Sequence, residues 1–115
     1  MTSEEFIKVI KEVVYKGSVD GVVSLLKNPP GRTPPEELLG MSSFFHSLND
    51  TQKSTLVQII DMACEDTLFG MLCVLDGVRA IEDGPDKGSL ELKFSKNEQS
   101  VLLNDPEEDF LHDLL

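Results

Sequence analysis

Basic residues are scarce in this sequence, with 10 lysines and arginines against 21 aspartates and glutamates, and the formal net charge is −11. Residues 1–28 are neutral, 4 − 4 = 0, so the whole excess lies in residues 29–115, where 6 − 17 = −11. A field of this sign repels nucleic-acid phosphates and anionic lipid headgroups, and it attracts cationic partners. We therefore expect no binding to nucleic acid or to a membrane surface.

The sequence also has no long apolar run that is free of charge. Its most apolar stretch, Ser54–Val78, is interrupted by acids at positions 61, 65, 66 and 76. A membrane-spanning helix needs about 18 or more apolar residues in succession. The first residues, Met1-Thr2-Ser3-Glu4-Glu5, lack the positive charge with which a secretory leader begins. We expect no membrane segment and a cytoplasmic location.

Only two cysteines are present, Cys64 and Cys73. If they lie on one helix, they are on opposite sides of it and about 13 Å apart along its axis. Such a pair cannot form a disulfide while the helix is intact. We expect two reduced thiols that pack as small apolar side chains.

A chain of 115 residues has room for one modest core, so we expect a single acidic helical domain over residues 1–115. Thr2 and Glu5 form a capping-box pattern ahead of a first helix that reaches about residue 16. Gly17 is expected to end this helix and Ser18 to cap a second. Pro29-Pro30 would end that second helix, since proline cannot supply the donors of a continuing helix.

Two further helix starts follow. Thr33-Pro34-Pro35-Glu36 combines a capping threonine, a proline and a first-turn acid. Asn49 or Asp50 is expected to cap the fourth and longest helix, from about Thr51 to Ile81. Two adjacent apolar stripes on this helix predict burial on two sides, and a third, polar stripe predicts that most of its acids, including Asp76, face water.

The pattern changes after residue 81. Ser89–Ser95 alternates with period two and predicts a half-buried strand, residues 96–99 can turn the chain, and Ser100–Leu103 can return as a second strand. Asp105-Pro106-Glu107 then predicts a short terminal helix. The expected fold class is mainly α within α+β, with a four-helix core, a long central helix, a C-terminal β-hairpin and a short terminal helix.

One pair of acids could carry chemistry. Asp61 and Glu65 are four residues apart and share a helical face, where two carboxylates can attract a cation or divide acid and base roles. His46 could complete a ligand set, so a small metal-dependent enzyme using Asp61, Glu65 and His46 is one alternative. A metal site needs three or four ligands, however, and no paired-histidine or Glu-x-x-His signature is present. We expect these acids to be a solvated face.

Other catalytic patterns are missing. The sequence has no Gly-x-Ser-x-Gly elbow and no phosphate-binding glycine loop. His112 stands among acids in a tail that we expect to be solvated. The sequence therefore predicts a protein that is not an enzyme, with no catalytic residue, no metal ligand and no cofactor.

The C-terminal stretch from Asn104 to Leu115 has five acids and no base. An acidic rim beside apolar anchors can attract and then hold a basic protein. The other interpretation is that the acids only complement a helix dipole while the leucines dock on the body. The candidate partner-binding residues are Asp105, Glu107, Glu108, Asp109, Phe110 and Asp113.

Ser47-Leu48-Asn49-Asp50-Thr51-Gln52 before a long helix, followed by a hairpin and the ending NDPEEDFLHDLL, is similar in layout to small bacterial families of acidic helical proteins. Some proteins of that build are toxin-immunity partners, so the resemblance implies a protein-binding role and supplies no catalytic residue. It covers roughly Ser43 to the end. The first hypothesis is a non-catalytic protein-binding module of immunity or inhibitor type for a basic protein. A second is a structural protein that self-associates, as a dimer for example, through Ser89–Leu103 and the last helix.

Overall fold

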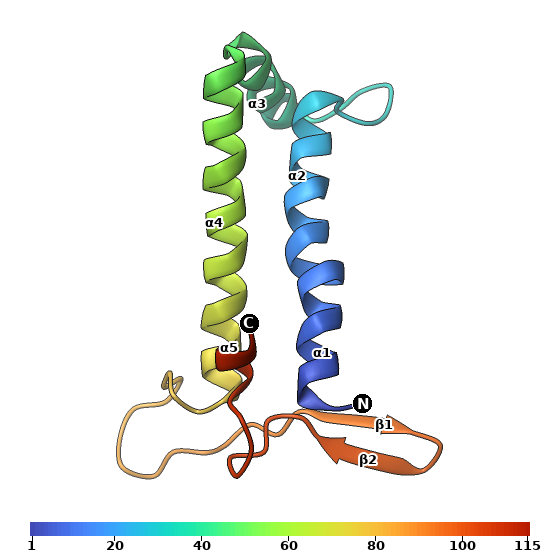
Figure 1. The fold of residues 1–115 in the computed structure, drawn as a ribbon. Helices are drawn as coiled ribbons and strands as arrows, with labels where there is room; N and C mark the ends of the chain where they lie inside the picture. The colour runs from blue at the N-terminus through green and yellow to red at the C-terminus, as the bar shows by residue number, and fades with distance from the viewer. The chain divides into compact units, whose positions relative to one another are not determined.

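A computed structural model describes all residues from Met1 to Leu115. It is 58% helical, with a long helix, a two-stranded antiparallel hairpin and a short C-terminal helix, which confirms the expected fold class (Figure 1). The chain forms two compact units. We call Val13–Glu65 the middle unit, and Met1–Glu12 together with Asp66–Leu115 the terminal unit. The expectation of one domain over residues 1–115 stays a prediction.

The N-terminal part of the chain is helical from Ser3 to Lys27. It comprises α1 (Ser3–Ile10), a π-helical segment η1 (Lys11–Lys16) and α2 (Gly17–Lys27). The predicted capping box is present: the Glu5 N–H donates to Thr2 Oγ1 over 3.1 Å, and the Thr2 N–H donates to Glu5 Oε2 over 3.2 Å. The predicted break at Gly17 is wrong. One glycine costs a helix only about 1 kcal/mol, too little to stop it without a proline or an alternative cap.

The helix α3 (Glu36–Ser47) packs on α2 within the middle unit. Ser42 is buried in this contact, and its hydroxyl donates to the carbonyl oxygen of Leu26 over 2.6 Å. Phe45 is buried beside it. The Lys53 ammonium lies 5.4 Å from the centre of the Phe45 ring, which is within cation–π range.

The longest helix, α4 (Asp50–Leu75), begins as predicted and ends earlier than predicted. Asn49 and Gln52 form its capping box: the Gln52 N–H donates to Asn49 Oδ1 over 2.8 Å, and the Asn49 N–H donates to Gln52 Oε1 over 3.0 Å. At the other end Gly77 adopts a φ of 76° and its N–H donates to the carbonyl of Val74. The Val78 N–H donates to the carbonyl of Cys73. These two bonds form a Schellman motif, so the helix does not continue to Ile81.

The apolar side chains of α4 are less deeply buried than predicted, since Leu56, Val57 and Leu68 are only half-buried. Its fully buried residues are Gly70, Leu72 and Cys73, whereas the apolar side chain of Met71 is exposed. A small folding unit buries a limited share of its surface and leaves such side chains uncovered. Both cysteines are free thiols, as expected. Cys73 is buried and Cys64 is half-buried.

The predicted hairpin is present with shorter strands, β1 (Lys93–Lys96) and β2 (Gln99–Leu102). They pair antiparallel, with Phe94 opposite Val101. Asn97 and Glu98 have φ values of 52° and 63°, as a two-residue hairpin turn with two left-handed residues requires. Beyond the ladder the Leu103 N–H donates to the carbonyl of Leu92 over 2.8 Å.

The core of the terminal unit joins its two ends. Ile7 of α1, Leu72 of α4 and Leu111 of α5 (Leu111–Leu114) are its buried members. Phe6, Leu68, Leu75, Leu92, Leu114 and Leu115 pack against them and are partly buried. The Ser3 hydroxyl also donates to the Leu103 carbonyl over 2.7 Å. The N-terminal helix is thus packed and hydrogen-bonded to segments about 100 residues later in the chain.

The last helix does not begin at Asp105 as predicted. Asp105 forms a turn in which its Oδ1 accepts the Glu107 N–H over 3.0 Å and its carbonyl accepts the Glu108 N–H over 3.1 Å. Helix α5 begins at Leu111 and has no cap from its preceding residue Phe110. An aspartate followed by proline suits a turn as well as a helix start, and the docking of Leu111 in the core favours the turn.

Two glycine substitutions test these helices in opposite directions. Gly21 lies inside α2 with open space around its Cα, so Gly21→Ala should raise the free energy of unfolding by up to about 1 kcal/mol. Gly77→Ala should lower it by about 1 kcal/mol or more, because a side chain strains the left-handed backbone. Urea unfolding followed by far-ultraviolet circular dichroism measures both. Equal effects of the two variants would contradict the helical conformation of Gly21 within α2 or the left-handed turn at Gly77.

Candidate functional site

The Asp76 side chain is only 1% exposed, so its carboxylate is buried. It directly follows the last residue of α4, and the Schellman turn at Gly77 leads the chain away from it. Its Oδ1 accepts the Leu111 N–H over 3.0 Å, and its Oδ2 accepts the His112 N–H over 2.9 Å. Asp76 therefore caps α5 from 35 residues away in the sequence. The prediction that Asp76 faces water is wrong.

His112 completes this cluster. Its Nδ1 lies 2.7 Å from Asp76 Oδ2 and donates to it, since a carboxylate accepts. The Phe69 ring meets the imidazole edge-on at 5.5 Å, and the Phe110 ring stacks on it at 5.4 Å with 19° between the planes. Nε2 lies 3.4 Å from Asp113 Oδ1. The imidazole is thus held on each side, and the prediction that it is solvated in a tail is wrong.

The C-terminal acids are held on the body by the leucines beside them. Leu111 is 0% exposed, and Leu114 and Leu115 pack on the same core. Of the six predicted partner-binding residues, Asp105 is half-buried, and Glu107, Glu108, Asp109, Phe110 and Asp113 are exposed. The leucines cannot serve as anchors for a partner, because they already pack in the protein. Phe110, 36% exposed, is the one large apolar side chain that remains beside these acids.

Asp61 and Glu65 lie side by side on α4, as predicted, and they bind a phenol. The hydroxyl of Tyr15 in η1 donates to Asp61 Oδ1 over 2.8 Å, and Glu65 Oε2 lies 3.2 Å from the same oxygen. This arrangement raises the pKa of Tyr15: the hydrogen bond to Asp61 contributes most, followed by desolvation and the two negative charges. The acid pair therefore holds the protonated phenol in place.

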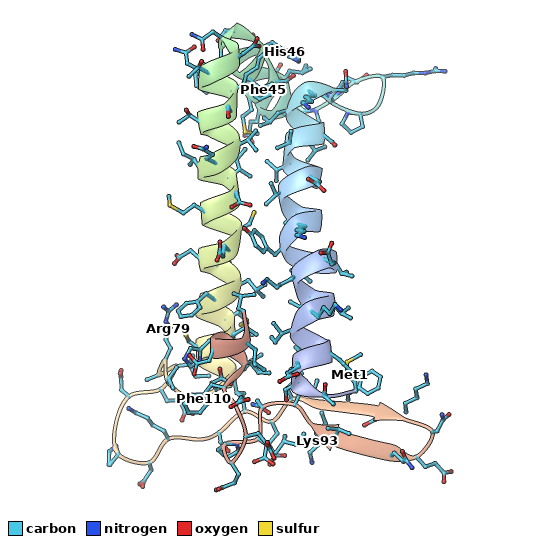
Figure 2. The ribbon with its side chains drawn as sticks, viewed as in Figure 1. Met1, Phe45, His46, Arg79, Lys93 and Phe110 are labelled. Atoms are coloured by element: carbon cyan, nitrogen blue, oxygen red, sulfur yellow. The ribbon has the colours of Figure 1, made fainter.

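His46 is not brought to this pair. It lies on α3 beside Phe45 (Figure 2). Its Nε2 donates to the carbonyl oxygen of Lys27 over 2.8 Å. That carbonyl belongs to the last residue of α2, where no further helical turn supplies a donor. No group of three or more His, Cys, Asp or Glu side chains is placed to hold a metal ion. The enzyme that would use Asp61, Glu65 and His46 stays an untested alternative, without a ligand set.

Sequence reasoning missed one buried amide. Asn104 Nδ2 donates to the carbonyls of Leu75 over 2.6 Å and Leu90 over 2.8 Å, and its Oδ1 accepts the Leu92 N–H over 2.8 Å. It thereby ties the end of α4 to the segment that enters the hairpin. No local pattern reveals this role. The Leu75-Asp76-Gly77 run, in contrast, does carry a helix-end signal in its glycine.

No family model, curated protein or solved structure matches this chain. The similarity in layout to acidic helical families therefore stays a prediction. None of the helices combines the length and apolar character that crossing a bilayer requires.

Removing the buried carboxylate should detach α5. We expect Asp76→Ala to lower the free energy of unfolding by about 2 kcal/mol, because two backbone donors and an imidazole lose their acceptor. The matched control is Asp109→Ala, an exposed acid on the same segment, which should cost less than about 0.5 kcal/mol. Chemical unfolding of both variants makes the comparison. Equal losses would contradict the capping role.

The phenol should titrate at unusually high pH. Tyr15 is the only tyrosine and the chain has no tryptophan, so near-ultraviolet phenolate absorbance reports it alone. The folded pKa lies above the usual 10.0, so the stabilisation is fully present below pH 10.0 and is lost as the pH rises further. Asp61→Asn should move the midpoint back toward 10.0, since Asp61 contributes most. A phenolate titration midpoint at pH 10.0 in the native protein would contradict the assigned hydrogen bond between Tyr15 and Asp61.

Proposed function

We propose that this chain is a non-catalytic protein-binding module that holds a cationic protein through the acidic segment from Asp105 to Asp113. A protein of this kind can act as an inhibitor or immunity partner by covering a basic surface. The proposal involves no cofactor and no reaction.

The observation that supports it most is the complete burial of Leu111 within this segment. With Leu111 in the core and its N–H bound by Asp76, the acids next to it are held on the body of the protein. Charged groups that are already ordered lose less conformational freedom on binding than those of a free tail. The exposed carboxylates of Glu107, Glu108 and Asp109 are thus suited to a fixed basic surface.

The distribution of charge supports the same conclusion. The terminal unit has six bases and fifteen acids, 6 − 15 = −9, whereas the middle unit has 4 − 6 = −2. Nearly all of the excess charge therefore belongs to the unit that carries the acidic segment. Such an asymmetric field speeds the encounter with a cationic protein and orients it toward one unit.

The exposed aromatic ring adds a short-range contact. Phe110 stacks on His112, and the His112 imidazole is fixed by its hydrogen bond to Asp76. One face of the Phe110 ring therefore packs on a fixed group. A rigid aromatic beside charged groups is a common anchor in protein interfaces. Phe110 can also receive a lysine or arginine through a cation–π contact.

The association rate with a purified partner tests this proposal. The partner is first captured on the immobilised protein and then purified, and binding is followed at several salt concentrations. The triple variant Glu107→Gln, Glu108→Gln, Asp109→Asn should slow association by about tenfold at low salt, because the steering charge is lost. The effect should shrink as screening increases.

A second triple variant, Asp20→Asn, Glu36→Gln, Glu37→Gln, is the matched control. It removes the same number of charges from exposed positions of the middle unit. It should change the association rate by less than about threefold, because these residues are not part of the acidic segment that contacts the partner in the proposal. Equal slowing by the two variants, or a rate that is indifferent to salt, would overturn the proposed function.

A further inference from the structure

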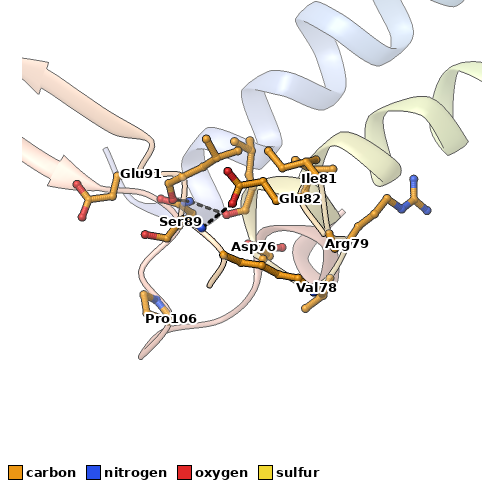
Figure 3. A pocket seen from close by; sticks show the side chains of 16 residues that line it. Asp76, Val78, Arg79, Ile81, Glu82, Ser89, Glu91 and Pro106 are labelled. Carbon is orange, nitrogen blue, oxygen red and sulfur yellow. Dashed lines mark hydrogen bonds between the residues drawn. The ribbon is translucent and has the colours of Figure 1, made fainter. Parts of the chain in front are cut away.

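The terminal unit contains an open cavity of about 530 Å³ that the acidic segment only borders. It lies among the end of α4, the loop that follows it and the turn after β2, and Pro106 forms part of its rim (Figure 3). Ligand sites commonly enclose about 300 to 1,000 Å³. The cavity is therefore large enough for a long side chain and part of the backbone that carries it.

Apolar side chains line much of this cavity. Val74 and Leu75 from α4 are half-buried at its wall, and Leu90, which precedes the hairpin, also lines it. Val78 and Ile81 are 52% and 66% exposed, so the protein itself leaves them uncovered. Apolar walls of this kind suit the methylene stem of a lysine or arginine, which packs on apolar surface while its charge stays outside.

One carboxylate is available to a bound charge. Glu82 lines the cavity, and its Oε2 accepts the Gly88 N–H over 2.8 Å, which fixes the side chain. Its Oε1 accepts no hydrogen bond within the chain. Asp76 also lines the cavity, but its carboxylate is committed to α5. Figure 3 shows Glu91 directed away from the cavity, and it pairs with Lys93 over 3.3 Å.

The protein's own cations do not neutralise Glu82. The Arg79 guanidinium points away from the cavity. It packs against Gly70 of α4 and occupies the space that a side chain at position 70 would need. Lys87 lines the cavity but forms no ion pair with Glu82. A cation that enters from outside therefore meets a fixed and unpaired carboxylate, within a unit whose net charge is −9.

We infer that this cavity binds a lysine or arginine side chain of the partner, with its stem against Val78 and Ile81 and its charged end at Glu82. The inference rests on the proposed function in one respect, since it names the part of a cationic partner that enters the module. The acidic segment would provide attraction over a distance, and the cavity would hold one basic side chain at close range.

Titration with small probes tests the inference directly. N-acetyl-lysine methylamide is added to the full chain, and the amide resonances of Gly88 and Ser89 are followed by NMR. We expect the shifts to saturate as the lysine probe is added. N-acetyl-norleucine methylamide has the same stem and no charge, and its affinity should be about fivefold weaker. A difference of this size corresponds to the free energy of a partly exposed ion pair. An arginine probe should bind like lysine.

Two variants locate the charge. Glu82→Gln retains an acceptor for Gly88 and should weaken the lysine probe about fivefold. Asp83→Asn removes the same charge from a neighbouring residue outside the cavity lining, and it should change the affinity by less than about twofold. Equal affinity for the lysine and norleucine probes, an absence of saturation, or equal effects of the two variants would each overturn the inference.

The two proposals fail separately. If the lysine probe binds as described but the acidic triple variant associates with its partner at the normal rate, the cavity assignment stands and the proposed function falls. If the triple variant slows association but no probe saturates the cavity, the proposed function stands and this inference falls.

Discussion

The C-terminal end of α4 is the point on which the terminal unit depends. A helix leaves its last four carbonyls without helical donors, and here all four are satisfied. The Asp76 N–H donates to Leu72, those of Val78 and Arg79 to Cys73, and that of Gly77 to Val74. The Leu75 carbonyl accepts Asn104 Nδ2. One residue further, the Asp76 carboxylate caps α5. The loop, the hairpin entry and the last helix are all tied to this end.

A buried carboxylate is costly unless donors surround it, and Asp76 receives three. This desolvation cost favours a single position of α5, because moving α5 would leave the buried Asp76 carboxylate without its donors. The docking of Leu111 and the capping by Asp76 therefore reinforce each other. Their joint effect turns an acidic ending into an ordered acidic surface, which is the basis of the proposed binding to a basic protein.

Several residues whose chemistry suggests catalysis serve helix ends and side-chain anchoring. His46 donates to the end of α2, His112 donates to Asp76, and Asp61 with Glu65 holds Tyr15. Each polar group is used inside the fold, and none of them converges with a third ligand. Glu82 differs because it is fixed by Gly88 and still has a free oxygen beside an apolar cavity. This difference is why the inferred side-chain site lies there.

The sequence by itself determined what depends on neighbours a few residues apart. The capping boxes at Thr2 and Asn49 and the left-handed turn at Asn97 depend only on residues close in the sequence, so these two helix starts and the hairpin could be predicted. Tertiary structure decided that Asp105-Pro106 forms a turn and that Asp76 caps α5. Both conformations depend on the burial of Leu111 and on a hydrogen bond between residues 35 positions apart in the sequence. Local signals permit several structures with similar energies, and only the burial of a shared core selects among them.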